Sequence, residues 1–218
     1  MAHRIPLWVK NTFSDDEGTE IVPREDFPGR RATGVTHTGK LVYIQFDLTP
    51  ASALHRAPLE AAIYATMAKY GVHLHMLNVS PSSTGFAVPR EQYGTVDNVL
   101  DGLVLPVGWG GDRAIYLFQI GIASKEVETQ AELLSPLGNV RRVGAQLTEG
   151  CTVVSLVGHE FMQQPGLFAA VLSELHQNGV TVLQTSDSEF SLSVLVTEGE
   201  QARAIRLLHE RFDLAQVR

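Results

Sequence analysis

The chain has 218 residues, 44% of them hydrophobic and 19% charged, and its formal net charge is −7. This length allows one large domain or two of about 100 residues, and the apolar content excludes wholesale disorder. The acidic balance argues against a nucleic-acid partner, and no apolar run approaches the roughly 18 residues that a membrane helix requires.

The start of the chain and its cysteine content indicate a compartment. No apolar signal region follows Met1, and a single cysteine, Cys151, cannot form an internal disulfide. We therefore expect a soluble, cytoplasmic protein with neither a nucleic-acid nor a membrane partner.

Residues 1–39 lack a regular pattern. The apolar stretch 5–9 precedes an acidic, turn-forming cluster at 14–18. Prolines and glycines then interrupt the segment as far as residue 34, which excludes a long helix or strand. We interpret this segment as a linker or as the tail of a domain with no core of its own.

A regular pattern begins at residue 40. Residues 41–46 form an apolar run typical of a strand, and Pro58 can occupy the first turn of the helix that follows. Apolar residues recur on that helix with a spacing of three or four up to Tyr70, and Gly71 is placed to end it. Residues 72–77 then alternate with period two, which predicts a second strand.

The same order returns about 108 residues later. A strand at 152–157 precedes a helix that Pro165 and Gly166 open and Gly179 ends, and strands follow at 180–183 and 191–196. A last helix is expected at about 200–212. The sequence therefore predicts a β-α-β-β-α unit that occurs twice.

The first copy is the longer one. We interpret residues 114–120 as its third strand and 126–137 as its second helix, which leaves an insertion near 81–113. Within this insertion, residues 108–111 are rich in glycine. A strand follows them and no Lys-Ser/Thr pair closes them, so they predict a turn and not a phosphate-binding loop.

Several short motifs resemble, in the same order, the regulatory region of aspartate kinases (aspartokinases). Residues 153–166 and 179–188 look like the second ACT domain of that family. Three further segments are similar to earlier parts of the family's chain: 5–19 to the last strand of the kinase domain, 33–37 to the entry into the first ACT domain, and 71–81 to the helix end and second strand of that domain. The match runs nearly end to end, apart from the insertion.

The resemblance implies an α+β fold of two ferredoxin-like ACT domains (βαββαβ), each an antiparallel sheet with helices on one face. It divides the chain into a remnant of a kinase-domain end and a linker at 1–39, a first ACT domain at 40–147, and a second at 148–218. The family's Lys-x-Gly-Gly-Thr/Ser phosphate-binding motif has no counterpart in this sequence. We therefore expect no catalytic site here, only the regulatory portion of an aspartate kinase.

Two segments of the second repeat carry groups suited to a free amino acid. A helix N-terminus offers N–H donors to a carboxylate, and a glycine there lets the ligand approach the backbone. Hydroxyls and a carboxylate in the other segment can hold an ammonium group. Such residues are also common turn formers, and the resemblance is what favours an effector site. The expected effector-binding residues are Glu160, Met162, Gln164, Pro165, Gly166, Gln184, Thr185, Ser186, Asp187 and Ser188.

A second effector site in the first repeat is less complete. Pro58 stands where the second repeat has Gly166, and His75 stands where the family usually has an aspartate. His73 and His75 share a strand face, but no third ligand is apparent, so we expect no metal and no cofactor. The polar candidates for this second site are Asp47, Thr49, Ser52, His75 and Asn78.

The resemblance implies feedback control of aspartate-family amino-acid biosynthesis. The expected effector is lysine, threonine or meso-diaminopimelate, and residues 184–188 most resemble the diaminopimelate-sensitive branch. The expected partners are the kinase domain or catalytic subunit of an aspartate kinase and a second copy of the chain, paired through the ACT domains. A stand-alone ACT-domain amino-acid sensor that acts on another protein is the alternative.

Overall fold

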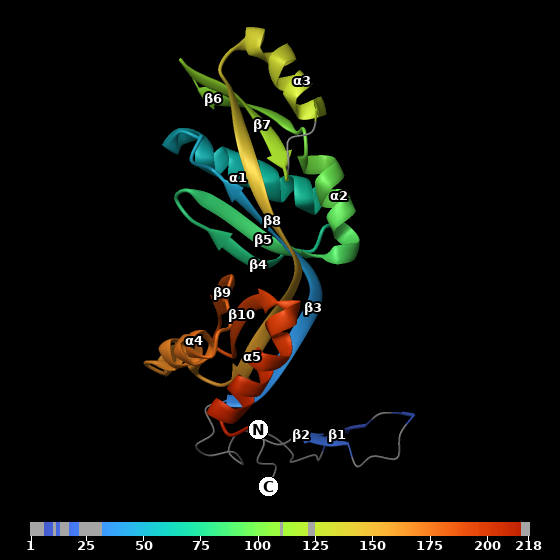
Figure 1. The fold of residues 1–218 in the computed structure, drawn as a ribbon, viewed down its shortest axis with the longest axis vertical. Helices are drawn as coiled ribbons and strands as arrows, with labels where there is room; N and C mark the ends of the chain where they lie inside the picture. Colours follow the sequence, from blue (N-terminus) through green and yellow to red (C-terminus); the bar gives the residue numbers. More distant parts are fainter. Residues whose placement is uncertain are drawn as a thin grey trace.

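The computed structural model describes residues 7–10, 12–13, 18–21, 32–109, 111–121 and 125–214 (Figure 1). The strands are β1 Leu7–Val9, β2 Thr19–Ile21, β3 Ala32–Asp47, β4 His75–Val79, β5 Ser83–Pro89, β6 Val104–Trp109, β7 Asp112–Ile120, β8 Val140–Gly158, β9 Gln184–Asp187 and β10 Ser191–Thr197. The α-helices are α1 Ala53–Lys69, α2 Arg90–Leu100, α3 Lys125–Leu134, α4 Leu167–Gln177 and α5 Glu198–Arg211, with 3-10 turns at Ser135–Leu137 and Phe161–Gln163.

Two α+β units share two long strands. β3 has 16 residues and β8 has 19, and Figure 1 shows both strands passing from the unit with α1–α3 into the unit with α4 and α5. The strand order β4-β5-β3-β8-β10-β9 therefore runs continuously through both units. The expected α+β fold with two repeated units is confirmed, but the two sheets are joined through common strands.

The first unit buries one face of its sheet under helices. Alternate residues of β3, among them Ile44 and Phe46, point toward α1 and α2, as period-two alternation requires. Phe46 is fully buried, and its ring lies 6.0 Å from that of Phe86 and 5.8 Å from that of Phe118, measured between centroids. Helix α1 contributes Leu59, Ile63 and Met67, three of the residues in the expected stripe.

The insertion lies later in the chain than expected. β5 lies between β3 and β4 and pairs with both, and α2 follows it directly. Residues 83–100 therefore supply the third strand and second helix of the first unit, whereas the sequence suggested an insertion near 81–113. β6, β7 and α3, within 104–134, are the additional elements. The alternation that marks a half-buried strand is missing in β5, because Thr84–Val88 are all buried.

The additional elements introduce a parallel strand pair. β7 pairs with β8 in parallel, from Ile115↔Val140 to Ile120↔Ala145, so the sheet is not antiparallel throughout. A parallel neighbour requires a crossover connection, and α3 supplies it. β6 and β7 form a hairpin whose last described pair is Trp109↔Asp112, which agrees with the turn expected at 108–111, although Gly110 lies outside the described residues.

The second unit takes a strand from the start of the described chain. Residues 32–38 of β3 pair with 153–158 of β8, which makes them a fourth strand beside β8, on the side away from β10. Part of the segment 1–39, expected to be a remnant and linker, therefore belongs to this sheet. Earlier in the chain, β1 and β2 pair with each other, while residues 5, 6 and 14–17 lie outside the described residues.

Some element boundaries differ from the sequence expectation. Pro58 lies inside α1 and not in its first turn, where it cannot donate the helical hydrogen bond to the Leu54 carbonyl. The strand expected at 180–183 begins at Gln184, whereas β10 and α5 lie where the pattern placed them. Among the described helices, none is both long and apolar enough to cross a membrane.

A third apolar cluster lies where the two units meet. Leu41, Tyr43 and Cys151 on the shared strands pack with Ala87 and Leu195, one residue from each unit. Cys151 is fully buried, and burial raises the pKa of its thiol, which disfavours the reactive thiolate. Its Sγ donates a hydrogen bond to the Thr148 carbonyl at 3.2 Å, so its surroundings are those of a packing residue.

Candidate ligand-binding site

The loop after β8 turns sharply before α4 begins. Glu160 has a left-handed backbone conformation (φ 54°, ψ 33°), and so has Gly166 at the N-terminus of α4 (φ 84°). Glycine adopts this conformation at little cost, which explains its place here. Pro165 and Gly166 are exposed, so both lie on an accessible surface.

Gln164 holds this loop and also offers an unsatisfied acceptor. Its Nε2 donates a hydrogen bond to the His159 carbonyl at 2.8 Å. Its Oε1 is buried and has no hydrogen-bond partner among the described residues. A buried polar atom without a partner costs about 1–3 kcal/mol, so a ligand donor that reached Oε1 would gain that interaction.

The other predicted segment forms an edge strand and a turn. Gln184–Asp187 make up β9, which pairs with β10, and the side chains of Ser186 and Asp187 are exposed. Ser188 begins the turn, where its Oγ accepts a hydrogen bond from the Ser191 N–H at 3.0 Å. Ser188 is thus a turn former in this structure, the ordinary reading of a serine at such a position.

The structure brings the loop and the turn to the same end of the sheet. The Phe161 N–H donates to the Glu189 carbonyl at 3.1 Å, and the Gly158 N–H donates to the Phe190 carbonyl at 3.0 Å. The rings of His159 and Phe190 meet edge to face, with centroids 5.9 Å apart. The two predicted segments are therefore neighbours, although no hydrogen bond among the described residues joins Gln164 or Gly166 directly to Asp187.

The candidates in the first unit lie on separate elements. Asp47, at the end of β3, accepts a hydrogen bond from the Thr49 N–H at 2.9 Å, and hydrogen bonds from the Thr49 hydroxyl and N–H lower the pKa of this carboxyl. His75 and Asn78 belong to β4, and β5 lies between β3 and β4. The five residues therefore do not form one compact group.

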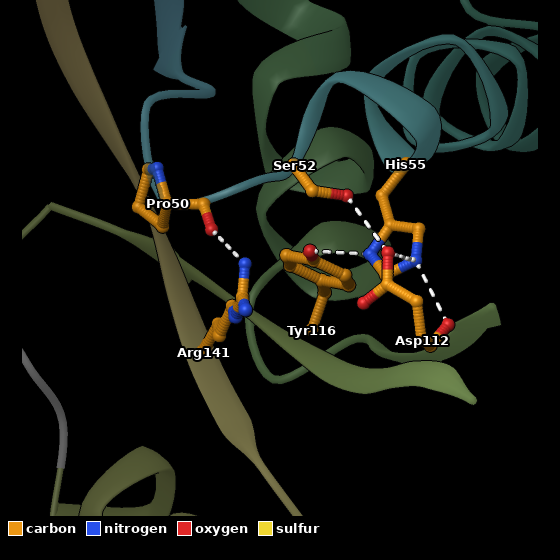
Figure 2. Close-up of polar contacts among 6 residues, drawn as sticks. All are labelled: Pro50, Ser52, His55, Asp112, Tyr116 and Arg141. Carbon is orange, nitrogen blue, oxygen red and sulfur yellow. Dashed lines mark hydrogen bonds and ion pairs between the residues drawn. The ribbon is translucent and has the colours of Figure 1, made fainter.

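Ser52 belongs to a polar cluster that the sequence analysis missed (Figure 2). His55, on the first turn of α1, is buried: its Nδ1 lies 2.7 Å from the Tyr116 hydroxyl, and its Nε2 lies 3.3 Å from Asp112 Oδ2 and 3.2 Å from the Asp112 carbonyl. Ser52 Oγ donates to the same Oδ2 at 3.4 Å. Because Nε2 faces two acceptors, we place the proton on Nε2 and let Nδ1 accept from Tyr116.

This cluster fastens the loop between β3 and α1 to the additional hairpin. In Figure 2, Arg141 of β8 reaches the same loop, and its Nη1 donates to the Pro50 carbonyl at 2.8 Å. His55 and Asp112 are 57 residues apart, so no local sequence motif predicts their contact. A polar residue within an otherwise apolar stripe was the only signal that the sequence offered.

Comparison with known proteins shows what this chain is similar to. Residues 146–210 match the ACT domain family. The chain is 24% identical over 222 residues to aspartokinase 1 of Bacillus subtilis, an alignment that covers 99% of this chain and 45% of that protein. The chain therefore spans less than half the length of this relative.

Solved structures show the same fold. The regulatory subunit of aspartate kinase from Thermus thermophilus superposes with a TM-score of 0.54 and 16% identity, covering 83% of this chain and 97% of that one. E. coli aspartokinase III in complex with lysine and aspartate gives a TM-score of 0.57 and 13% identity, over 97% of this chain and 39% of that one. The resemblance to the aspartokinase regulatory region and the ACT fold are thus confirmed.

Proposed function

Because this chain is similar along nearly its whole length to aspartokinases and contains an ACT domain at 146–210, we propose that it is a regulatory region that binds an amino-acid end product. The candidate effectors are lysine, threonine and meso-diaminopimelate. In this proposal, occupancy controls an aspartate kinase domain or catalytic subunit and thereby the synthesis of aspartate-family amino acids. The chain itself carries no catalytic role.

The buried Oε1 of Gln164, which has no hydrogen-bond partner in the part of the chain that the structure describes, is the observation that carries the proposal. This atom lies in the loop that the sequence analysis predicts to bind the effector. It can accept a hydrogen bond from the ammonium group of an amino acid. The exposed carboxylate of Asp187, at the neighbouring strand end, supplies the negative charge. The exposed N-terminus of α4 at Gly166 suits the ligand's carboxylate.

A thermal-shift screen of the twenty amino acids and meso-diaminopimelate tests this proposal. An effector at about a hundred times its Kd should stabilise the chain by about 2.7 kcal/mol. For a chain of this size, that is a rise in Tm of about 5–10 °C. If none of these compounds raises the Tm at millimolar concentration, the proposed function is wrong.

Replacing Asp187 by alanine should weaken effector binding roughly tenfold to a hundredfold, because a charge-assisted hydrogen bond is worth about 1.5–3 kcal/mol. The Tm without ligand should change little, since the side chain is exposed. Glu128→Ala, which removes an exposed carboxylate from α3, is the control and should bind like the parent. An Asp187→Ala variant that binds as tightly as the parent would show that the residue only shapes the strand end.

We also propose that the chain forms a homodimer through its ACT units. β4 ends the strand path, and its residues Leu77 and Val79 are 49% and 57% exposed. An exposed edge strand with apolar side chains favours pairing with another strand. Light scattering should give twice the chain mass of 23.8 kDa.

Val79→Lys should shift this dimer toward monomer, because it places a charge on the pairing edge. Leu133→Lys, at a 72% exposed site on α3, is the control and should leave the mass unchanged. A parent chain that stays at the monomer mass across micromolar concentrations would contradict the dimer.

A further inference from the structure

A cavity of about 670 Å³ lies between α1 and the β6–β7 hairpin of the first unit. Leu54, Pro58 and Ala62 recur every four residues, so they share one face of α1 and form one wall. Leu105 and Val107 of β6 form the opposite wall and are partly buried against the core of the first unit. The volume falls in the range of sites for small organic molecules.

One end of this cavity is negatively charged. Asp112 lines it with a side chain that is 46% exposed. Asp112 Oδ2 contacts Ser52 and His55, whereas Oδ1 has no hydrogen-bond partner among the described residues (Figure 2). None of the described residues that line the cavity is lysine or arginine. The carboxylate beside these apolar walls is therefore complementary to a cation.

The groups behind Asp112 hold this carboxylate in place. The side chain of His55 is 3% exposed and is fixed by Tyr116 on one nitrogen and by Asp112 on the other. Because both partners belong to β7 and His55 belongs to α1, the cluster sets the separation of the two cavity walls. A site between a helix and a hairpin that are tied together in this way is preorganised for its ligand.

The edge strand of the hairpin disfavours a peptide as the occupant. Among the described strands, β6 pairs with β7 alone, so its other edge has a row of backbone groups that a further strand could join. Pro106, in the middle of β6, has no N–H to donate to such a strand. The cavity therefore suits a small molecule better than strand addition.

We propose that this cavity binds a small molecule with a protonated amine at one end and an apolar body. The amine donates to Asp112 Oδ1, and the body lies between the Leu54–Pro58–Ala62 wall and β6. The site belongs to the additional hairpin, lies in the other unit from the Gln164 loop and β9, and does not rest on the function proposed for those segments. Figure 1 places α1 and β6 in one unit and α4 and β9 in the other.

Three probes with the same apolar body and different charge test the proposal on the full chain: 2-phenylethylamine, 2-phenylethanol and 3-phenylpropionate. Titration calorimetry should show the amine binding at least about tenfold more tightly than the alcohol, and the carboxylate binding most weakly, since Asp112 repels it. Equal affinity of the amine and the alcohol would overturn the proposal. So would binding of an extended peptide in place of all three probes.

Two variants locate the binding. Asp112→Asn keeps the shape of the side chain and should remove the preference for the amine, with less than about a twofold change for the alcohol. Ala62→Trp fills the cavity and should abolish binding of both, and it provides the test if Asp112→Asn does not fold. Glu128→Gln removes a carboxylate from exposed α3 and should bind like the parent.

The controls separate this site from the effector site. Asp112→Asn should leave the response to the amino-acid effector intact, and Asp187→Ala should leave amine binding intact. If Glu128→Gln loses the amine preference as fully as Asp112→Asn does, the preference reflects net charge and the proposed site is wrong. Retention of amine binding in Ala62→Trp would overturn it as well.

Discussion

Replacing Phe46 by alanine should lower the free energy of unfolding by about 3–5 kcal/mol, the usual cost of removing a fully buried aromatic ring. Phe46 has no exposed surface, and its ring packs against Phe86 of β5 and Phe118 of β7. The truncation therefore leaves a cavity among three strands that cannot easily close. Urea denaturation followed by circular dichroism measures the loss.

Phe168→Ala on α4 is the matched control, because that ring is 43% exposed. It should lower the free energy of unfolding by less than about 1.5 kcal/mol, because a side chain that stays 43% exposed gains only part of the free energy of transfer out of water. A Phe46→Ala variant with a loss as small as the control's would contradict the packing described for the first unit.

Replacing Gly108 by alanine should destabilise the chain by about 3 kcal/mol or more, within the range expected for strained backbone and steric clash. Gly108 has φ 149°, and an added Cβ would lie 2.2 Å from the Asp112 carbonyl oxygen and 2.6 Å from the Arg113 Cα. Both atoms belong to the backbone of β7, so the hairpin must open. Hydrogen exchange should show the amides of β6 and β7 losing protection first.

Gly111 provides a control within the same hairpin. A Cβ at Gly111 meets no atom within 4 Å, so Gly111→Ala should change the free energy of unfolding by less than about 1 kcal/mol. The variant separates a specific clash at Gly108 from a general intolerance of the hairpin to side chains. Equal losses at the two positions would mean that the contact with Asp112 is not the cause.

The second unit was largely predictable from the sequence, because local signals there agree with the fold. Gly179 ends α4, the run 191–196 forms β10, and the last apolar stripe forms α5. The first unit was harder. β5 is a central strand buried on both faces, so it lacks the alternation that identifies strands, whereas the pattern of β7 fits the expected third strand.

Part of the candidate site followed from topology and part did not. A loop after the first strand and a turn between the next two must lie at the same end of a β-α-β-β-α sheet, and residues 158–161 do contact 189–190. The contact of His55 with Asp112 and Tyr116 depends instead on where an additional hairpin packs. That packing is set by tertiary contacts, which periodicity does not encode.

The shared strands have a mechanical consequence. β3 and β8 change register on both sides of the Leu41–Cys151 pair, where Lys40 (φ 58°) and Gly150 (φ 63°) interrupt the extended backbone. Two strands that run through both units can carry a rotation from one unit to the other. They deform most easily where their backbone is irregular. A rotation of either unit about the long axis would therefore twist the other, with the deformation concentrated in the few residues around that pair.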